Sequence, residues 1–177
     1  AESWEASADA ATWNLKIRQG VEFHNGKTLD STDVVDSINR HLGEDSKSAA
    51  KGIMVGIKSV KADGKNNVVI ELTGGDADFP VLLSDYHMGI CPSNGDGTVD
   101  WQSGNGTGGY SLVEHEAGVQ TLTKRNPNYW KEGTAHFDEI ETNQIADVNA
   151  RTNAIQTGEL DCISNVSVKT VHLLKNA

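Results

Sequence analysis

The glycine-rich segment at residues 104–109 has residue types and spacing that are suited to binding chemistry. Gly104, Gly106 and Gly109 fit the G-x-G-x-x-G pattern that cradles a dinucleotide pyrophosphate. That chemistry needs a strand before the glycines and a helix after them, because the helix N-terminus must meet the phosphate. Here the strand-like run 110–113 follows instead. The glycines therefore predict a backbone bend between two parts of the chain rather than a nucleotide site.

The histidines and acidic residues show no spacing that is typical of catalysis or of metal binding. No histidine pair has the H-E-x-x-H spacing. Asp76, Asp78 and Asp85 could gather around a cation or serve a hydrolase, but they lack the spacing of a calcium loop, which favours solvated loop acids. We therefore assign no catalytic residue, no metal and no cofactor. The six histidines are expected at the surface or in the core: His24, His41, His87, His115, His136 and His172.

Cys91 and Cys162 form neither a disulfide scaffold nor a metal knuckle. Each lies in a short apolar run, predicted as a strand, where a buried free thiol is common. A disulfide between them stays open as an alternative in an oxidising compartment.

The aromatic residues are few, and most are expected in the core. Trp13 and Tyr110 begin predicted strands, and Trp130 is expected to be a buried aromatic whose loss would cost about 3–5 kcal/mol. Tyr86 and His87 follow a short predicted helix in a loop-rich part of the chain, so they are the aromatic pair expected to face a ligand.

The composition indicates an acidic globular protein. The 177 residues carry 15 Lys and Arg against 25 Asp and Glu, for a net charge of -10, which argues against nucleic-acid binding. Hydrophobic residues make up 37%, enough for a packed core, and no apolar run is long enough to span a bilayer. The chain has no initiator Met, so we expect a piece of a longer polypeptide, whose compartment its own ends do not indicate.

The periodicity predicts a mixed α/β fold with an antiparallel first part and a βαβ-like end. Asp30 is the expected N-cap of a helix, with Asp33 completing a capping box, Val34, Ile38 and Leu42 on its buried face, and Gly43 as its C-cap. Asp147 and Gly158 are expected to bound a later helix. The remaining strands are predicted at 12–18, 57–61, 67–72, 88–91, 110–116, 119–125, 137–145 and 160–163, and short helices at 46–52, 78–83 and 168–174.

Several segments, in order, resemble the signature of the family 5 solute-binding proteins, the dipeptide and oligopeptide receptors of ABC importers. Gly106-Thr107-Gly108-Gly109-Tyr110 resembles the family's Gly-Thr-Gly-Pro-Tyr, with Gly109 in place of the proline. The other matching segments are Ser3-Trp4, the run from Trp13 to Gly26, Asp33 to Ile38, Arg125 to Trp130, Asp147 to Arg151, and Gly158 to Asp161.

The resemblance implies a periplasmic-binding-protein-like fold in which two lobes close on a ligand. This chain would be a partial first lobe, with residues 1–131 as its antiparallel outer subdomain and 132–177 as an incomplete ligand-contacting part; the second lobe lies outside it. The implied function is capture of a peptide or another small solute and its delivery, unchanged, to an ABC permease. The implied protein is a monomer in the periplasm, or lipid-anchored at the cell surface, that docks peripherally on the membrane complex.

The candidate ligand contacts are chosen because they lie on loops. They are Tyr86, His87, Trp101, Gly106, Thr107 and Gly108. Two other classes stay open as alternatives: a secreted hydrolase with carboxylate catalysis, and a structural or regulatory binding module that has lost transport.

Overall fold

The computed structural model describes residues 1–169 and 171–174, which divide into two compact units. Unit 1 comprises Ala1–Leu112 and Lys124–Asp138, and unit 2 comprises Val113–Thr123 and the described residues from Glu139 onward. The division predicted at residue 131 separates two parts of the first lobe, and it stays a prediction.

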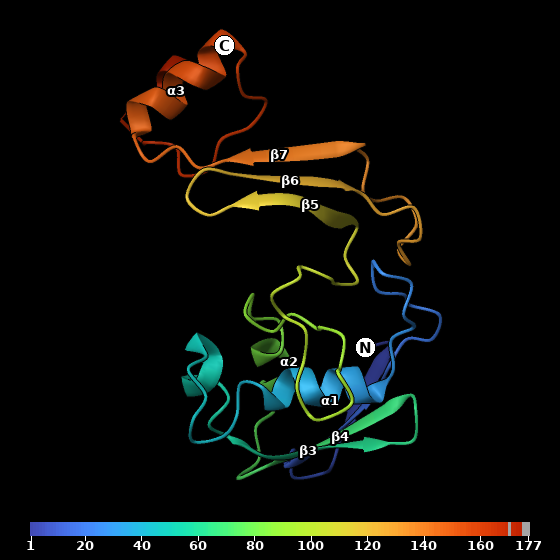
Figure 1. Ribbon diagram of the computed structural model, residues 1–177. Helices are drawn as coiled ribbons and strands as arrows, with labels where there is room; N and C mark the ends of the chain where they lie inside the picture. Colours follow the sequence, from blue (N-terminus) through green and yellow to red (C-terminus); the bar gives the residue numbers. More distant parts are fainter. Residues whose placement is uncertain (170, 175–177) are drawn as a thin grey trace. The chain divides into compact units, whose positions relative to one another are not determined.

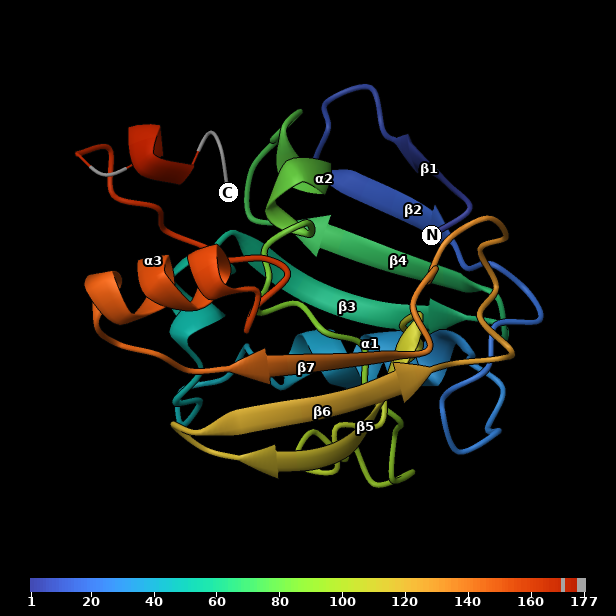
Figure 2. The same cartoon turned by 90° about the horizontal axis from the view of Figure 1, so that it is seen from above.

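A four-stranded antiparallel sheet lies in unit 1 (Figures 1 and 2). The strand order is β1-β2-β4-β3. The strands predicted at 12–18, 57–61 and 67–72 are present as β2, β3 and β4, with β3 and β4 paired antiparallel. The short edge strand β1 was not predicted; its side chains are exposed, and it is held by backbone pairing with β2. The bounds are β1 (Ser3–Ala6), β2 (Thr12–Lys16), β3 (Ile57–Asp63) and β4 (Asn67–Leu72).

Alternating side chains of β2 and β4 form the centre of the core. Trp13 pairs with Ile70 and Leu15 with Val68 across the ladder, and these four side chains are all buried. The expectation that Trp13 packs inward is thus confirmed. Each buried aliphatic side chain contributes about 1.5–3 kcal/mol relative to an exposed one, so this sheet face is a main source of stability in unit 1.

Helix α1 (Ser31–Asn39) packs on β3 and β4 and begins as its sequence predicts. The Asp30 carboxylate accepts hydrogen bonds from the backbone N–H groups of Thr32 (2.9 Å) and Asp33 (3.4 Å), and the Asp33 carboxylate accepts one from the Asp30 N–H (3.0 Å). The capping box is therefore complete. Val34 and Ile38 face the core.

The end of α1 was predicted about one turn too late. The helix ends at Asn39, and the N–H of Leu42 donates to the Asn39 carbonyl, a tighter i to i+3 bond that interrupts the α-helical pattern. Gly43 does adopt a positive φ of 81°, but in the turn beyond the helix. Leu42 still packs against the core, so the predicted apolar face is right although the helix is shorter.

The strand predicted at 88–91 is wrong. The backbone N–H of Cys91 donates to the Ser37 hydroxyl at 2.9 Å, and the N–H of Ser93 donates to the Asp33 carboxylate at 2.7 Å. Side chains of α1 thus accept hydrogen bonds from the backbone N–H groups that strand pairing would otherwise use. The helices expected near 46–52 and 78–83 are present as the 3-10 helix η1 (Ala49–Gly52) and α2 (Phe79–Leu82).

A three-stranded sheet of order β5-β6-β7 precedes helix α3. Helix α3 (Val148–Thr157) has Asp147 as its N-cap, bonded to the Ala150 N–H at 2.7 Å, and Gly158 at its end with φ 74°. Both predicted bounds are confirmed. The three strands are β5 (Tyr110–Glu116), β6 (Gln120–Arg125) and β7 (Glu139–Asn143).

The strand predicted at 160–163 is wrong, and with it the βαβ-like end. The N–H groups of Glu159 and Leu160 both donate to the Ala154 carbonyl, at 2.9 and 3.2 Å, so this segment completes the end of α3. Of the helix expected over 168–174, the structure has the 3-10 helix η2 (Val171–Leu174), while residue 170 lies outside the described residues.

Two expectations about buried side chains also fail. Trp130 is 42% exposed, so it is not a core residue. Cys91 and Cys162 are free thiols and lie in loops rather than strands, Cys91 half-buried and Cys162 exposed. Burial raises the pKa of the Cys91 thiol.

Gly75 approaches another backbone segment so closely that no side chain fits. A Cβ built on Gly75 would lie 2.0 Å from the carbonyl oxygen of Asp9, whereas one on Gly74 would meet nothing within 4 Å. We expect Gly75→Ala to lower the free energy of unfolding by about 1–3 kcal/mol, since the backbone must shift. Gly74→Ala is the matched control and should cost less. Urea unfolding of both variants measures the difference, and equal stabilities would contradict the prediction.

Candidate functional site

Tyr86 and His87 follow α2, and their rings contact each other, with His87 held by Asp85. Tyr86 is 88% exposed, and its ring centroid lies 3.9 Å from that of His87. The Asp85 carboxylate accepts a hydrogen bond from the His87 backbone N–H at 2.9 Å and lies 2.7 Å from His87 Nδ1. These hydrogen bonds lower the pKa of Asp85. The arrangement presents the Tyr86 ring to solvent, where it can stack on a ligand.

Trp101 lies near the end of α1, and one face of its ring is occupied. The Arg40 guanidinium carbon is 4.4 Å from the ring centroid, a cation–π contact. Trp101 remains 53% exposed, so the rest of its surface is open to a partner.

The backbone of Gly106 and Gly108 is held by His24. His24 Nδ1 accepts from the Gly106 N–H at 3.3 Å, His24 Nε2 lies 3.0 Å from the Gly108 carbonyl, and the His24 N–H donates to the Gly106 carbonyl at 2.9 Å. Asn126 Nδ2 also donates to the Gly108 carbonyl, at 3.0 Å. Both ring nitrogens are satisfied by a neutral imidazole with its proton on Nε2. The protein itself thus bonds the N–H and the carbonyl of Gly106 and the carbonyl of Gly108.

The bonds from His24 to Gly106 and Gly108 were not found by sequence reasoning, which placed His24 only among the histidines expected at the surface or in the core. Its partner Gly106 lies 82 positions away, and no local pattern carries that information. His41 is the buried histidine, 2% exposed, with Nδ1 2.5 Å from the Ser48 hydroxyl; burial, and then Arg40, lower its pKa.

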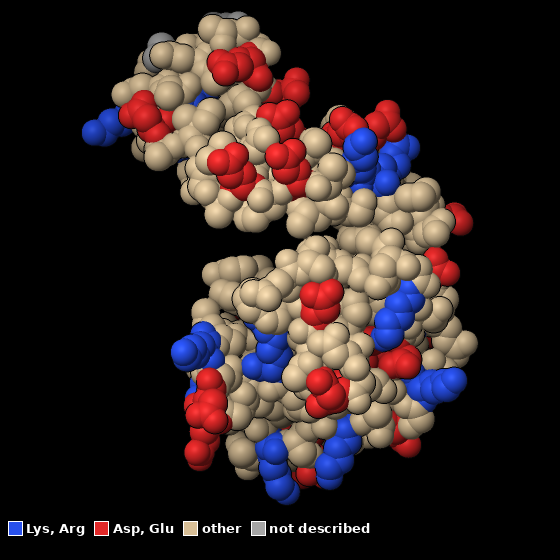
Figure 3. Space-filling view, in the orientation of Figure 1, with Lys and Arg blue, Asp and Glu red and all other residues tan. Residues whose placement is uncertain are grey.

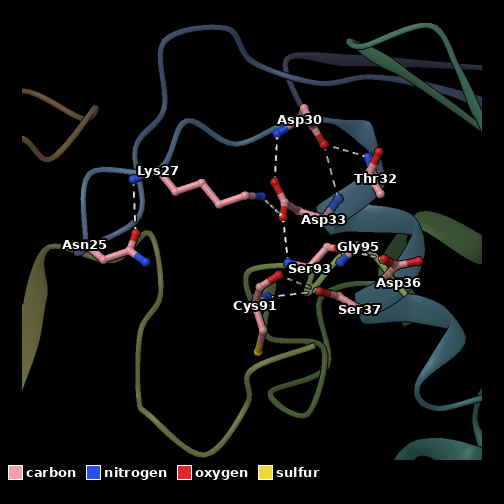
Figure 4. A network of polar contacts seen from close by, with 10 residues as sticks. All are labelled: Asn25, Lys27, Asp30, Thr32, Asp33, Asp36, Ser37, Cys91, Ser93 and Gly95. Carbon is pink, nitrogen blue, oxygen red and sulfur yellow. Dashed lines mark hydrogen bonds and ion pairs between the residues drawn. The ribbon is translucent and has the colours of Figure 1, made fainter. Parts of the chain in front are cut away.

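A polar network fixes the loop 91–95 on α1 (Figure 4). The fully buried Asp33 carboxylate accepts from the Ser93 N–H and forms an ion pair with Lys27. The Ser93 hydroxyl donates to Asp36 at 2.5 Å and accepts from the Gly95 N–H at 3.0 Å. The network fixes on α1 the loop that precedes Trp101 in the sequence.

An apolar cavity of about 380 Å³, here called the Trp4–Trp130 cavity, is lined by residues of unit 1. Arg18 lies over the Trp130 ring at 4.6 Å from its centroid. Of the six candidate contacts, Thr107 alone lines the cavity. The lining residues are Ala1, Trp4, Leu15, Ile17, Arg18, Val21, Leu29, Val34, Ile38, Pro80, Leu83, Ser84, Met88, Ile90, Thr107 and Trp130.

Two of the three acidic residues considered for a hydrolase accept local hydrogen bonds. Asp76 accepts from the Asp78 N–H at 2.9 Å, and Asp85 is bonded to His87. Among the described residues, no group of three or more His, Cys, Asp or Glu side chains could hold a metal ion. Nor has any helix in the described ranges the length and hydrophobicity to cross a bilayer.

The charges differ between the two units. The visible face of unit 2, which carries α3, shows mainly Asp and Glu, whereas the visible face of unit 1 mixes both signs (Figure 3). Exposed aromatic side chains on such a surface, Tyr86 and Trp101 among them, can contribute contacts to a small solute.

A model of the bacterial extracellular solute-binding proteins, family 5 (Middle), matches residues 1–177. The chain belongs to this family. The resemblance seen in the sequence motifs is thereby confirmed.

Sequence identity to individual solute-binding proteins agrees with this family assignment. The chain is 30% identical over 170 residues to the nickel-binding periplasmic protein of Escherichia coli K12, covering 92% of this chain and 32% of that protein. It is 26% identical over 170 residues to the oligopeptide-binding protein AppA of Bacillus subtilis, covering 91% and 31%. The chain thus spans about a third of the length of the curated relatives it matches.

The fold class is confirmed by solved structures. The periplasmic binding protein AgaA of A. tumefaciens R10, in complex with agropinic acid, superposes with a TM-score of 0.91 at 26% identity, covering 100% of this chain and 36% of AgaA. The mixed α/β chain therefore has a fold found within periplasmic binding proteins.

Proposed function

We propose that the chain is part of the substrate-binding component of an ABC importer, which captures a small solute between two lobes and delivers it unchanged to a membrane permease. The match of the family 5 model over residues 1–177 carries this proposal. Ligand capture by closure requires that the solute bind the closed form better than the open one, and it requires no catalytic group.

A peptide is the solute we propose. Two kinds of relative support this choice by their names, oligopeptide-binding AppA and glutathione-binding GsiB. The relatives named for nickel, haem and agropinic acid make those solutes the alternatives to be included in a test.

In this proposal the substrate-binding component is a monomer. It acts outside the cytoplasm, either in the periplasm or lipid-anchored at the cell surface. Residues 1–131 would form the outer subdomain of the first lobe, and 132–177 part of its ligand-contacting region. The solute contacts from this chain would be Tyr86, His87, Trp101 and Thr107, with the Gly106 and Gly108 backbone held in place beside Thr107 by His24.

Calorimetry on the full-length protein tests the proposal, with panels of short peptides, glutathione, sugars, nickel, haem and opines. We expect heat and a raised thermal midpoint with peptides, and intact solute after prolonged incubation. No response to any solute would overturn the proposal, and turnover of the bound solute would favour the hydrolase alternative.

Tyr86 is the contact whose loss can be tested with least risk to folding, because it is 88% exposed. We expect Tyr86→Ala in the full-length protein to weaken solute binding about 2- to 10-fold, the effect of losing one aromatic contact. Val81→Ala is the matched control, since Val81 is exposed on the neighbouring helix α2 and should leave affinity unchanged. Equal affinities of the two variants would remove Tyr86 from the site.

A further inference from the structure

We propose that His24 is a positioning residue for solute binding, and that it acts in this way only while its imidazole is neutral. It holds the two residues that flank Thr107, Gly106 and Gly108, and so fixes the orientation in which Thr107 meets the solute. When both ring nitrogens carry a proton, one of these bonds is lost and residues 106–108 loosen. The inference rests on the proposed function, because Thr107 is a solute contact only within that proposal.

His24 bonds the chain on both sides of Thr107. The Gly106 N–H donates to His24 Nδ1 at 3.3 Å, and the Gly106 carbonyl accepts from the His24 backbone N–H at 2.9 Å. On the other side of Thr107, the Gly108 carbonyl lies 3.0 Å from His24 Nε2. One imidazole thus supplies two of the three bonds that restrain the residues before and after Thr107.

Thr107 depends on these restraints because both of its neighbours are glycines. Glycine has the greatest backbone freedom of any residue, so a Gly-Thr-Gly segment is mobile unless other groups hold it. Among residues 1–169 and 171–174, the Thr107 side chain forms no hydrogen bond of its own that would fix it. Bonds that order the segment before the solute arrives lower the entropic cost of binding, and they thereby raise the affinity.

The bond to Nδ1 is the one that the fold does not duplicate. Asn126 Nδ2 also donates to the Gly108 carbonyl, at 3.0 Å, so this carbonyl keeps a donor if the imidazole bond is lost. The Gly106 N–H has the unprotonated Nδ1 of His24 as its acceptor. Both nitrogens of an imidazolium are donors, so protonation of His24 sets an N–H group against the Gly106 N–H.

The segments that meet at His24 carry few other titratable groups. Its own turn contains Glu22 and Lys27, and both of these side chains are bonded to other residues. Residues 104–109 and 126–130, which bond to this turn, contain no Asp, Glu, Lys, Arg or His and a single tyrosine. His24 is therefore the only residue of these three segments whose type changes charge between about pH 5 and pH 8.

The first test is hydrogen exchange of the Gly106 amide in the solute-free full-length protein. His24→Asn puts an acceptor oxygen near the place of Nδ1, whereas the longer side chain of His24→Gln reaches the place of Nε2. At about pH 8 we expect His24→Gln to lower the Gly106 protection factor about fivefold, the effect of one lost hydrogen bond, and His24→Asn to keep it. At about pH 5 the wild type should fall to the level of His24→Gln, while His24→Asn stays protected.

The second test is calorimetry of the same full-length proteins with tri-alanine and with glutathione. We expect His24→Gln to weaken binding about 2- to 5-fold, because affinity falls with the fraction of the protein in which the segment is ordered. His115→Gln is the matched control. His115 is an exposed histidine of β5 whose Nδ1 lies 2.9 Å from the Thr121 hydroxyl, and its loss should change neither the Gly106 exchange nor the affinity.

Three results would overturn the proposal. They are equal Gly106 protection in the wild type, His24→Asn and His24→Gln at both pH values, full protection of the wild type at about pH 5, and unchanged affinity of His24→Gln for a peptide that the wild type binds. If His24→Gln does not fold, the comparison of His24→Asn with the wild type at about pH 5 decides. If neither peptide binds the wild type, the proposed peptide solute fails, and the exchange of Gly106 still decides whether neutral His24 holds the segment.

Discussion

Replacing Asp33 with alanine is expected to lower the free energy of unfolding by about 3–5 kcal/mol, because its buried carboxylate accepts from two backbone N–H groups and each hydrogen bond to a charged group is worth about 1.5–3 kcal/mol. The Asp33 side chain has no exposed surface, and its carboxylate joins three parts of unit 1: the N-cap of α1, the loop at Ser93, and Lys27. Its removal leaves the partly buried N–H of Ser93 and the Lys27 ammonium without this partner. Such a loss is a large part of the stability of an ordinary domain.

Equilibrium urea unfolding measures this effect, and two further variants separate its causes. Asp33→Asn keeps the shape and one acceptor oxygen, so it should cost less than Asp33→Ala. In a double-mutant cycle with Lys27→Met, the two losses should be less than additive, because each substitution breaks the same pair. Additive losses, or a cost of Asp33→Ala below about 1 kcal/mol, would show that the network is not coupled in this way.

Replacing Phe79 with alanine is expected to cost about 3–5 kcal/mol, as is usual for a buried aromatic. Phe79 is 2% exposed, and its ring centroid lies 6.0 Å from that of Trp13 inside the core cluster. Removal of the ring loses its buried surface and leaves a cavity beside Trp13.

Trp130→Ala is the comparison that tests this reasoning, because size alone would rank Trp130 above Phe79. Trp130 is 42% exposed, and its contacts are an edge contact with Tyr129 and the Arg18 guanidinium. An exposed cation–π contact is worth about 0.5–1 kcal/mol, so we expect a loss well below that of Phe79→Ala. If urea unfolding shows that Trp130→Ala destabilises the protein more than Phe79→Ala, then burial does not determine which of the two aromatic residues contributes more to stability.

Local patterns were sufficient to predict the elements that depend on neighbouring residues. The Asp30–Asp33 capping box, the alternation along 12–18 and the bounds of α3 at Asp147 and Gly158 are confirmed, because the donors and acceptors involved lie within a few positions of one another. The motifs from Trp13 to Gly26 and from Arg125 to Trp130 also identified the family, since each combines several residue types at fixed spacing.

The two wrongly predicted strands lie where backbone N–H groups bond to something other than a neighbouring strand. Residues 88–91 have the apolar run of a strand, yet Ser37 and Asp33 of α1 take the N–H groups of Cys91 and Ser93. Residues 160–163 also resemble a strand, yet the backbone there closes the end of α3. Hydrophobic periodicity measures which side of an element is buried, and it does not report which hydrogen-bond partner the backbone meets.

The sequence by itself determined the acidic character, the helix caps, the core alternation of β2 and β4, and membership of the solute-binding family, since all of these depend on residue type and short spacing. Only the tertiary structure decided that His24 holds Gly106 and Gly108, that Asp33 is a buried junction, and that Trp130 borders a cavity instead of filling a core. The physical reason is that these contacts join residues far apart in the chain, and their geometry is set by packing between elements.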